Sequence, residues 1–192
     1  MKRKRILKIF VYILTPLGLY FLIGPIWIRI NEAKMDAIND RIQKEGTGFV
    51  FSEVINKKFP ESNFVTVFNR ALRESETNQT IKVINFWYTR CAPCIQELPE
   101  LNQLVRDYDS TDVVFIAFTP DDNITVKKFL TEYQFDYHII PDSRQLIKEI
   151  MPVMIYPTHL VVNNDGKIIY SNSGFKYNEV RYVLDSLKSS PE

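Results

Sequence analysis

The feature that most constrains this chain is the position of its only two cysteines, Cys91 and Cys94, which are separated by two residues. The run before them, residues 81–87, is rich in β-branched and aromatic side chains and predicts a buried strand. The run after them, residues 95–105, has apolar residues at three- and four-residue spacing and predicts a helix with one buried face. The cysteine pair is therefore expected where a strand passes into a helix.

That position favours redox chemistry. Backbone N–H groups at a helix start have no intrahelical acceptor, so they stabilise an anion such as a thiolate. We expect the pKa of Cys91 to lie below the free value of about 8.5, which makes it the nucleophile. Cys94, one turn deeper, is expected to be the buried resolving thiol. Cys91 would form a mixed disulfide with a partner, and Cys94 would then release the partner by closing the Cys91–Cys94 bridge.

The cysteine pair has two alternative roles, half of a zinc site and a structural disulfide. A four-ligand zinc site needs a second pair of ligands, but the chain has no third cysteine, and His138 and His159 are far apart in sequence. A bridge across two residues closes a very short loop and adds little stability. Redox exchange is favoured, and it requires no cofactor and no metal.

Around these cysteines the chain resembles the thioredoxin superfamily, and within it the membrane-anchored, extracytoplasmic reductases of the TlpA and ResA type. The resemblance rests on the Cys91-Ala92-Pro93-Cys94 motif, on Trp87 before it and on Pro99 in the following helix. Asn85 stands where cytosolic thioredoxins have a buried acid. The resemblance implies an α/β thioredoxin-like fold, in which a mixed central sheet is flanked by helices.

Glu97 matches the active-site glutamate of these relatives, which implies a role in tuning the thiols and in proton transfer. From the residues alone, Glu97 lies three positions after Cys94 and therefore on the same side of a helix. A carboxylate there can accept the Cys94 proton or raise the pKa of that thiol. The alternative is a solvated surface glutamate.

A second segment that resembles the family begins at Tyr156-Pro157. The resemblance implies a cis peptide bond before Pro157, facing the active site, and substrate contacts by Trp87, Tyr156 and Pro157. Trp87 can equally pack into the core, and both roles stay open. His159, inside the strand that follows, is expected to be a hydrogen-bonded structural residue rather than a ligand.

The N-terminal part of the chain predicts a transmembrane helix. Residues 9–28 carry no charge and have about the length that spans a bilayer. Five basic residues precede this stretch, so the positive-inside rule predicts a cytoplasmic N-terminus and a catalytic domain outside the cytoplasmic membrane. A cleaved signal peptide is the alternative, but residues 28–32 offer no small-x-small cleavage site. We expect an anchor at 1–29, a stalk at 30–48 and a thioredoxin-like domain at 49–192.

The net charge of the chain restricts the classes of molecule that it can bind. The formal net charge of the 192 residues is +1, but without the five basic residues at positions 2–8 it is about −4. That balance argues against nucleic acid, which binds basic surfaces. The expected partners are the lipid bilayer, thiols and disulfides of cell-envelope proteins, and a membrane electron-donor protein.

The rest of the chain alternates between strand and helix patterns, which predicts a mixed sheet covered by helices on both faces. A hairpin is expected from the apolar runs 49–51 and 64–68, with a polar loop or insertion at 70–79. The expected strands are 112–118, 137–140, 158–162 and 167–170, and the expected helices are 124–133, 144–150 and 179–187.

Together these features predict a reductase of envelope-protein disulfides, with apocytochrome c among the substrates of such families. The reducing direction, as opposed to disulfide donation, is inferred from the resemblance and from Glu97. A strongly stabilised Cys91 thiolate would instead favour a disulfide-donating oxidase. A thioredoxin-like copper-binding assembly factor or chaperone is a further alternative, with His159 as a third ligand beside the two cysteines.

Overall fold

The computed structural model describes residues 51–60, 62–72, 80–108, 113–151 and 153–189. These residues belong to one compact unit, Gly46–Glu192. The predicted transmembrane segment at 9–28 and the predicted stalk at 30–48 lie outside the described residues. Within the described ranges, no helix has both the length and the apolar character that crossing a membrane requires.

A five-stranded sheet forms the centre of the fold, with strand order β5-β4-β3-β6-β7. β3, β4 and β5 are parallel, whereas β6 and β7 run antiparallel to their neighbours. This arrangement confirms the predicted mixed sheet. The strands are β3 (Ile81–Phe86), β4 (Val113–Phe118), β5 (His138–Ile140), β6 (Thr158–Val162) and β7 (Ile168–Ser173).

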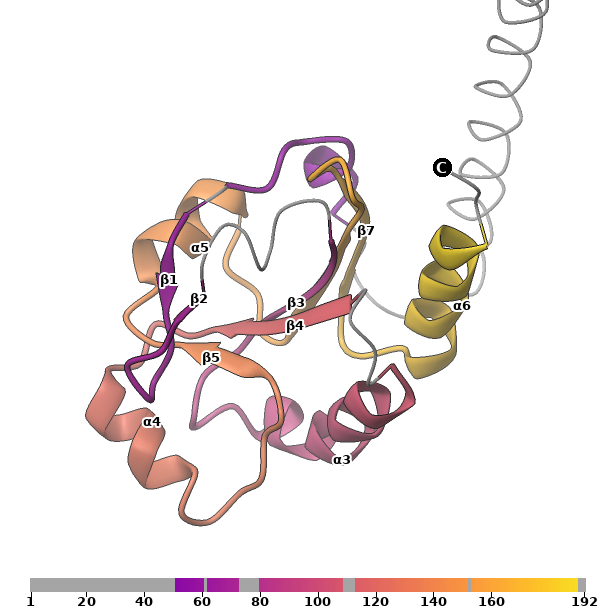
Figure 1. Ribbon diagram of the computed structural model, residues 1–192. Helices are drawn as coiled ribbons and strands as arrows, with labels where there is room; N and C mark the ends of the chain where they lie inside the picture. Colours follow the sequence, from indigo (N-terminus) through magenta and orange to yellow (C-terminus); the bar gives the residue numbers. More distant parts are fainter. Residues whose placement is uncertain (1–50, 61, 73–79, 109–112, 152, 190–192) are drawn as a thin grey trace, which may run out of the picture. The chain divides into compact units, whose positions relative to one another are not determined.

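Helices cover both faces of the sheet, as the alternating pattern predicts. In Figure 1, α5 and the β1–β2 hairpin lie on one side, and α3 and α6 lie on the other. All six residues of β3 are buried, because this strand has packed layers above and below it. The helices are α3 (Ala92–Asp107), α4 (Asn123–Phe129), α5 (Arg144–Ile150) and α6 (Tyr177–Lys188).

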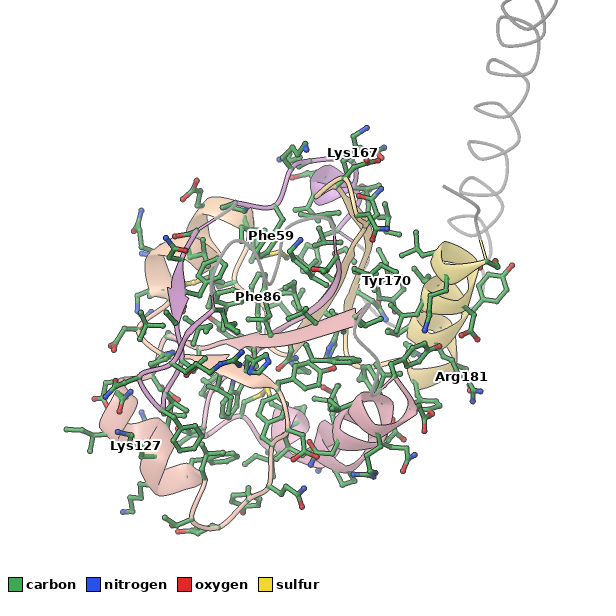
Figure 2. All side chains as sticks on the ribbon, in the orientation of Figure 1. Phe59, Phe86, Lys127, Lys167, Tyr170 and Arg181 are labelled. Carbon is green, nitrogen blue, oxygen red and sulfur yellow. A yellow bond between two sulfur atoms is a disulfide. The ribbon has the colours of Figure 1, made fainter. Side chains whose placement is uncertain are left out.

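The layer opposite α3 is a large apolar core, built from alternate residues of the central strands, from α5 and from the segment before β3. Figure 2 shows two of its members, Phe59 and Phe86, with Tyr170 further toward α6. Three aromatic rings contact Phe118, the last residue of β4; they belong to Phe59, Phe64 and Phe86. This core holds the strands whose ends carry the site.

The hairpin before β3 differs from its prediction. β1 (Phe64–Val65) pairs with β2 (Ala71–Leu72), which lies in the stretch predicted as a polar loop. Phe51, predicted in the first strand, instead precedes a 3-10 turn, η1 (Ser52–Val54). The physical reason is that Leu72 is buried in the core, while Asn69 in the connecting turn adopts a positive φ of 60°, which asparagine tolerates.

Candidate active site

The cysteine pair lies where the pattern places it, between the end of β3 and the start of α3. Cys91 is the N-cap residue of α3, and its Sγ accepts a hydrogen bond from the Cys94 N–H at 3.2 Å. Pro93 occupies the first turn, where a missing N–H removes no intrahelical bond. The helix start therefore directs a backbone donor at the Cys91 sulfur.

The two cysteines form a disulfide, with their Cα atoms 5.2 Å apart. Cys94 was expected to be buried, and it is 3% exposed. Cys91 is equally buried in this oxidised state, at 2%. A partner thiol can therefore attack the bridge only after Cys91 becomes accessible.

The loop between β3 and α3 is held by a residue that the sequence did not single out. Asp121 Oδ2 accepts a hydrogen bond from the Thr89 N–H at 2.7 Å. Asp121 follows β4, which is parallel to β3, so the carboxyl ends of the two strands lie at the same sheet edge. That placement was the only available signal, because Asp121 and Thr89 are 32 residues apart.

Trp87 belongs to the core rather than to an exposed groove. Its side chain is 1% exposed and packs against Phe129 and Phe135, with ring centroids 5.0 and 5.1 Å away. The indole Nε1 has no hydrogen-bond partner among the described residues. Of its two predicted roles, the structure supports packing, because a direct substrate contact requires an exposed ring.

The peptide bond between Tyr156 and Pro157 is cis, as the resemblance implies. Pro157 is buried, whereas Tyr156 is half-buried and meets the Tyr88 ring edge-on, with centroids 5.3 Å apart. Burial raises the pKa of Tyr156 above its ordinary value. Tyr88 comes from the β3–α3 loop, so this aromatic pair joins the cysteine loop to the cis-proline segment.

Glu97 is not a freely solvated glutamate. Its Oε2 lies 3.0 Å from His159 Nε2, and its Oε1 accepts a hydrogen bond from the Phe175 N–H at 2.6 Å. His159 is 1% exposed, and Asn85 Nδ2 lies 3.3 Å from its Nδ1. The prediction that His159 is a satisfied structural residue agrees with these contacts, but its carboxylate partner was not predicted.

Buried polar groups surround this pair. Tyr137 is fully buried, and its pKa lies well above the ordinary value, because burial and then the negative charge of Glu97 disfavour the phenolate. Asn172 is the cross-strand partner of His159 and is also buried. Within the described part of the chain, neither the Tyr137 hydroxyl nor Asn172 Oδ1 has a hydrogen-bond partner.

Gly174 connects this network to the cis-proline segment. Its N–H donates to the Pro157 carbonyl at 3.1 Å, and its φ of 82° lies in the left-handed region. A Cβ there would approach Glu97 Oε1 only to 3.9 Å, which is an ordinary contact. Backbone conformation, not crowding, therefore sets the cost of a side chain at this position.

Gly174→Ala should lower the free energy of unfolding by about 1 kcal/mol, because alanine at positive φ is strained. Urea unfolding followed by circular dichroism measures this loss. Asn178→Ala, at an exposed position of α6, is the control and should stay within about 0.5 kcal/mol of the unmodified chain. Equal stability of the two variants would contradict the expected strain.

Residues 55–171 match the model of the AhpC/TSA family. The thiol-disulfide oxidoreductase ResA of Bacillus thuringiensis subsp. konkukian is 30% identical over 147 residues, which cover 75% of this chain and 73% of the relative. The thioredoxin-like protein YneN of Bacillus subtilis is 33% identical over 89 residues, covering 45% and 52% of the two chains.

Solved structures show the same fold at lower identity. A thiol-disulfide oxidoreductase of Bacteroides fragilis matches with a TM-score of 0.59 and 18% identity, covering 68% of this chain and 99% of that one. A thiol:disulfide interchange protein of the thioredoxin family from Chlorobium tepidum matches with a TM-score of 0.60 and 18% identity, covering 69% and 96%. The chain has the thioredoxin-like α/β fold and belongs to the AhpC/TSA family, as a thiol-disulfide oxidoreductase related to the ResA proteins.

Proposed function

We propose that Cys91 is the nucleophile and Cys94 the resolving thiol of this oxidoreductase. The observation that carries the proposal is the position of Cys91 as the N-cap of α3, with the Cys94 N–H directed at its sulfur. The Cys91 thiolate attacks a partner disulfide, forms a mixed disulfide and releases one partner thiolate. Cys94 then attacks the Cys91 sulfur, closes the observed bridge and releases the second partner thiolate.

Glu97 takes the Cys94 proton in the second step. It lies three residues after Cys94 on α3, so the two side chains share one side of the helix. The proton leaves Cys94 as its sulfur attacks, passes to the carboxylate and then neutralises the departing partner thiolate. The buried contacts of Glu97 with His159 and Phe175 support this role over that of a solvated surface residue.

The substrate is bound at the cis-proline segment, where Tyr156 and Pro157 are the proposed contacts. The half-buried pair of Tyr156 and Tyr88 leaves aromatic surface for an extended substrate segment. Trp87 does not touch the substrate. Its ring packs against Phe129 and Phe135 and supports the cysteine loop from within the core.

The proposed location is outside the cytoplasmic membrane, with a single-pass anchor at residues 9–28 and the N-terminus in the cytoplasm. The uncharged stretch and the five basic residues before it support this proposal. Substrates would be disulfides of envelope proteins, for example apocytochrome c, and the electrons would come from a membrane donor protein.

Copper delivery has less support from the site. His159 directs Nε2 at Glu97, and the two cysteine sulfurs are bonded to each other. Across the described ranges, no group of three or more His, Cys, Asp or Glu side chains is placed to hold a metal ion. Nothing in the geometry favours copper over disulfide exchange, so this function is not proposed.

The reduction potential of the Cys91–Cys94 pair tests the proposed direction. The full-length protein is equilibrated with glutathione buffers, and the fraction of reduced cysteines is measured by alkylation. A reductase should give about −270 mV or a lower value. A potential near −120 mV would make the protein a disulfide donor and overturn the proposed direction, while leaving the roles of both cysteines in place.

A further inference from the structure

We infer that His159 is a positioning residue for Glu97, and that it acts as a neutral imidazole whose tautomer is set by Asn85. In this arrangement Nε2 carries the proton and donates it in a hydrogen bond to Glu97 Oε2. The inference rests on the proposed function, in which Glu97 accepts the Cys94 proton, and it adds the residue that holds the acceptor in place.

The first support is the set of contacts on the Glu97 carboxylate. One oxygen lies 3.0 Å from His159 Nε2, and the other accepts the Phe175 N–H at 2.6 Å. The Phe175 ring also packs on the imidazole, with centroids 5.0 Å apart. A carboxylate with a donor on each oxygen has one preferred orientation, and His159 supplies the only side-chain donor that the described residues give it.

The second support is the rigidity of the element that carries His159. It lies inside β6, where it pairs with Asn85 of β3 on one side and with Asn172 of β7 on the other. All three side chains are buried. Because β6 is a central strand of the sheet, its backbone holds the imidazole in place while the cysteine loop at the sheet edge changes its bonding.

The tautomer follows from the chemistry of the two neighbours. A carboxylate only accepts hydrogen bonds, so the nitrogen that faces Glu97 carries a proton. The Asn85 amide nitrogen, 3.3 Å from Nδ1 and 3.4 Å from Nε2, has two hydrogens to donate and cannot accept. Because Nε2 already carries the proton that faces Glu97, this amide can donate only to Nδ1. Nδ1 therefore lacks a proton. We assign a neutral ring with the proton on Nε2.

A purely structural role would leave the chemistry of Cys94 unchanged once the fold is intact. A positioning role predicts a specific defect in the second step of exchange, because a misplaced Glu97 accepts the Cys94 proton poorly. The defect should depend on the Glu97 carboxylate, and an uncharged N–H donor at position 159 should repair it. These three properties define the experiment.

The experiment measures the lifetime of the mixed disulfide between Cys91 and glutathione. Reduced full-length protein is mixed with excess glutathione disulfide, the reaction is quenched in acid, and intact masses are recorded. Cys91 displaces one glutathione thiolate, and Cys94 displaces the second as the bridge closes. In His159→Leu the lifetime should increase about tenfold, because a hydrogen bond to a charged group is lost.

Three further variants separate positioning from structure. His159→Gln restores an N–H donor and should recover most of the lost rate. In a Glu97→Gln background, His159→Leu should change the lifetime by less than about twofold, because the two residues act as one unit. Ser171→Ala changes a buried polar side chain on β7 whose strand partner, Leu160, belongs to the core on the opposite face. It should match the unmodified chain.

Nitrogen NMR of the reduced and oxidised unmodified protein tests the tautomer directly. The chain has only two histidines, and His159→Gln identifies the signal of His159. A neutral ring protonated on Nε2 is expected. An imidazolium, or a proton on Nδ1 alone, would overturn the inference.

The outcomes keep the two proposals apart. If the unmodified protein forms no mixed disulfide on Cys91, the proposed function fails. If the mixed disulfide forms and resolves equally fast in folded His159→Leu, only the positioning role of His159 fails. A loss of the same size in the Glu97→Gln background would also reject it, because His159 would then act independently of the carboxylate.

Discussion

Cys91→Ser should abolish thiol-disulfide exchange, with a loss of roughly three orders of magnitude or more, as expected when a covalent nucleophile is removed. The serine hydroxyl keeps the N-cap hydrogen bond to the Cys94 N–H but does not ionise near neutral pH. Activity is measured as reduction of glutathione disulfide by the reduced protein. The fold should survive, because serine is a preferred N-cap residue.

Cys94→Ser should give the opposite result in a trapping experiment. Cys91 still attacks a partner disulfide, but no second thiol is available to resolve the product, so the mixed disulfide accumulates. Alkylation followed by non-reducing gel electrophoresis detects it in cells that express the full-length variant. Cys91→Ser is the matched control and should trap nothing. Equal trapping by both variants would contradict the assigned roles of the two cysteines.

The local part of this site was predictable because short-range signals determine it. An apolar run, two cysteines and a helical repeat lie within 25 residues, and the structure confirms the strand, the helix and the junction. α4 is shorter than predicted and ends at Phe129, because Thr131 bonds back only three residues, to Lys128, in a tighter turn. Helix ends depend on such single bonds, which periodicity does not encode.

The environment of Glu97 was not predictable, because its partners are distant in sequence. His159 is 62 residues away and Phe175 is 78 residues away. Both contacts depend on how α3 packs over β6 and on the conformation of the loop after β7. The prediction of the hairpin strands failed for a different reason. β1 and β2 contain two residues each and are too short to show an alternating pattern.

Phe118→Ala should cause the largest loss of stability of any change argued for this chain, about 3–5 kcal/mol in the free energy of unfolding. Phe118 is fully buried at the end of β4 and meets the Phe64 ring edge-on, with centroids 4.9 Å apart. Truncation removes these contacts and leaves a cavity that neighbouring strands cannot close. Urea unfolding, monitored by circular dichroism, measures the change.

Phe68→Ala is the matched control, because it removes the same ring from the β1–β2 turn, where Phe68 is 72% exposed. Its effect should stay within about 0.5 kcal/mol. Phe118 lies on the face of the sheet away from α3, so the folded fraction of Phe118→Ala should still exchange disulfides. A small loss in Phe118→Ala, or an equal loss in Phe68→Ala, would contradict the described core. Loss of exchange in folded Phe118→Ala would show instead that this face also shapes the site.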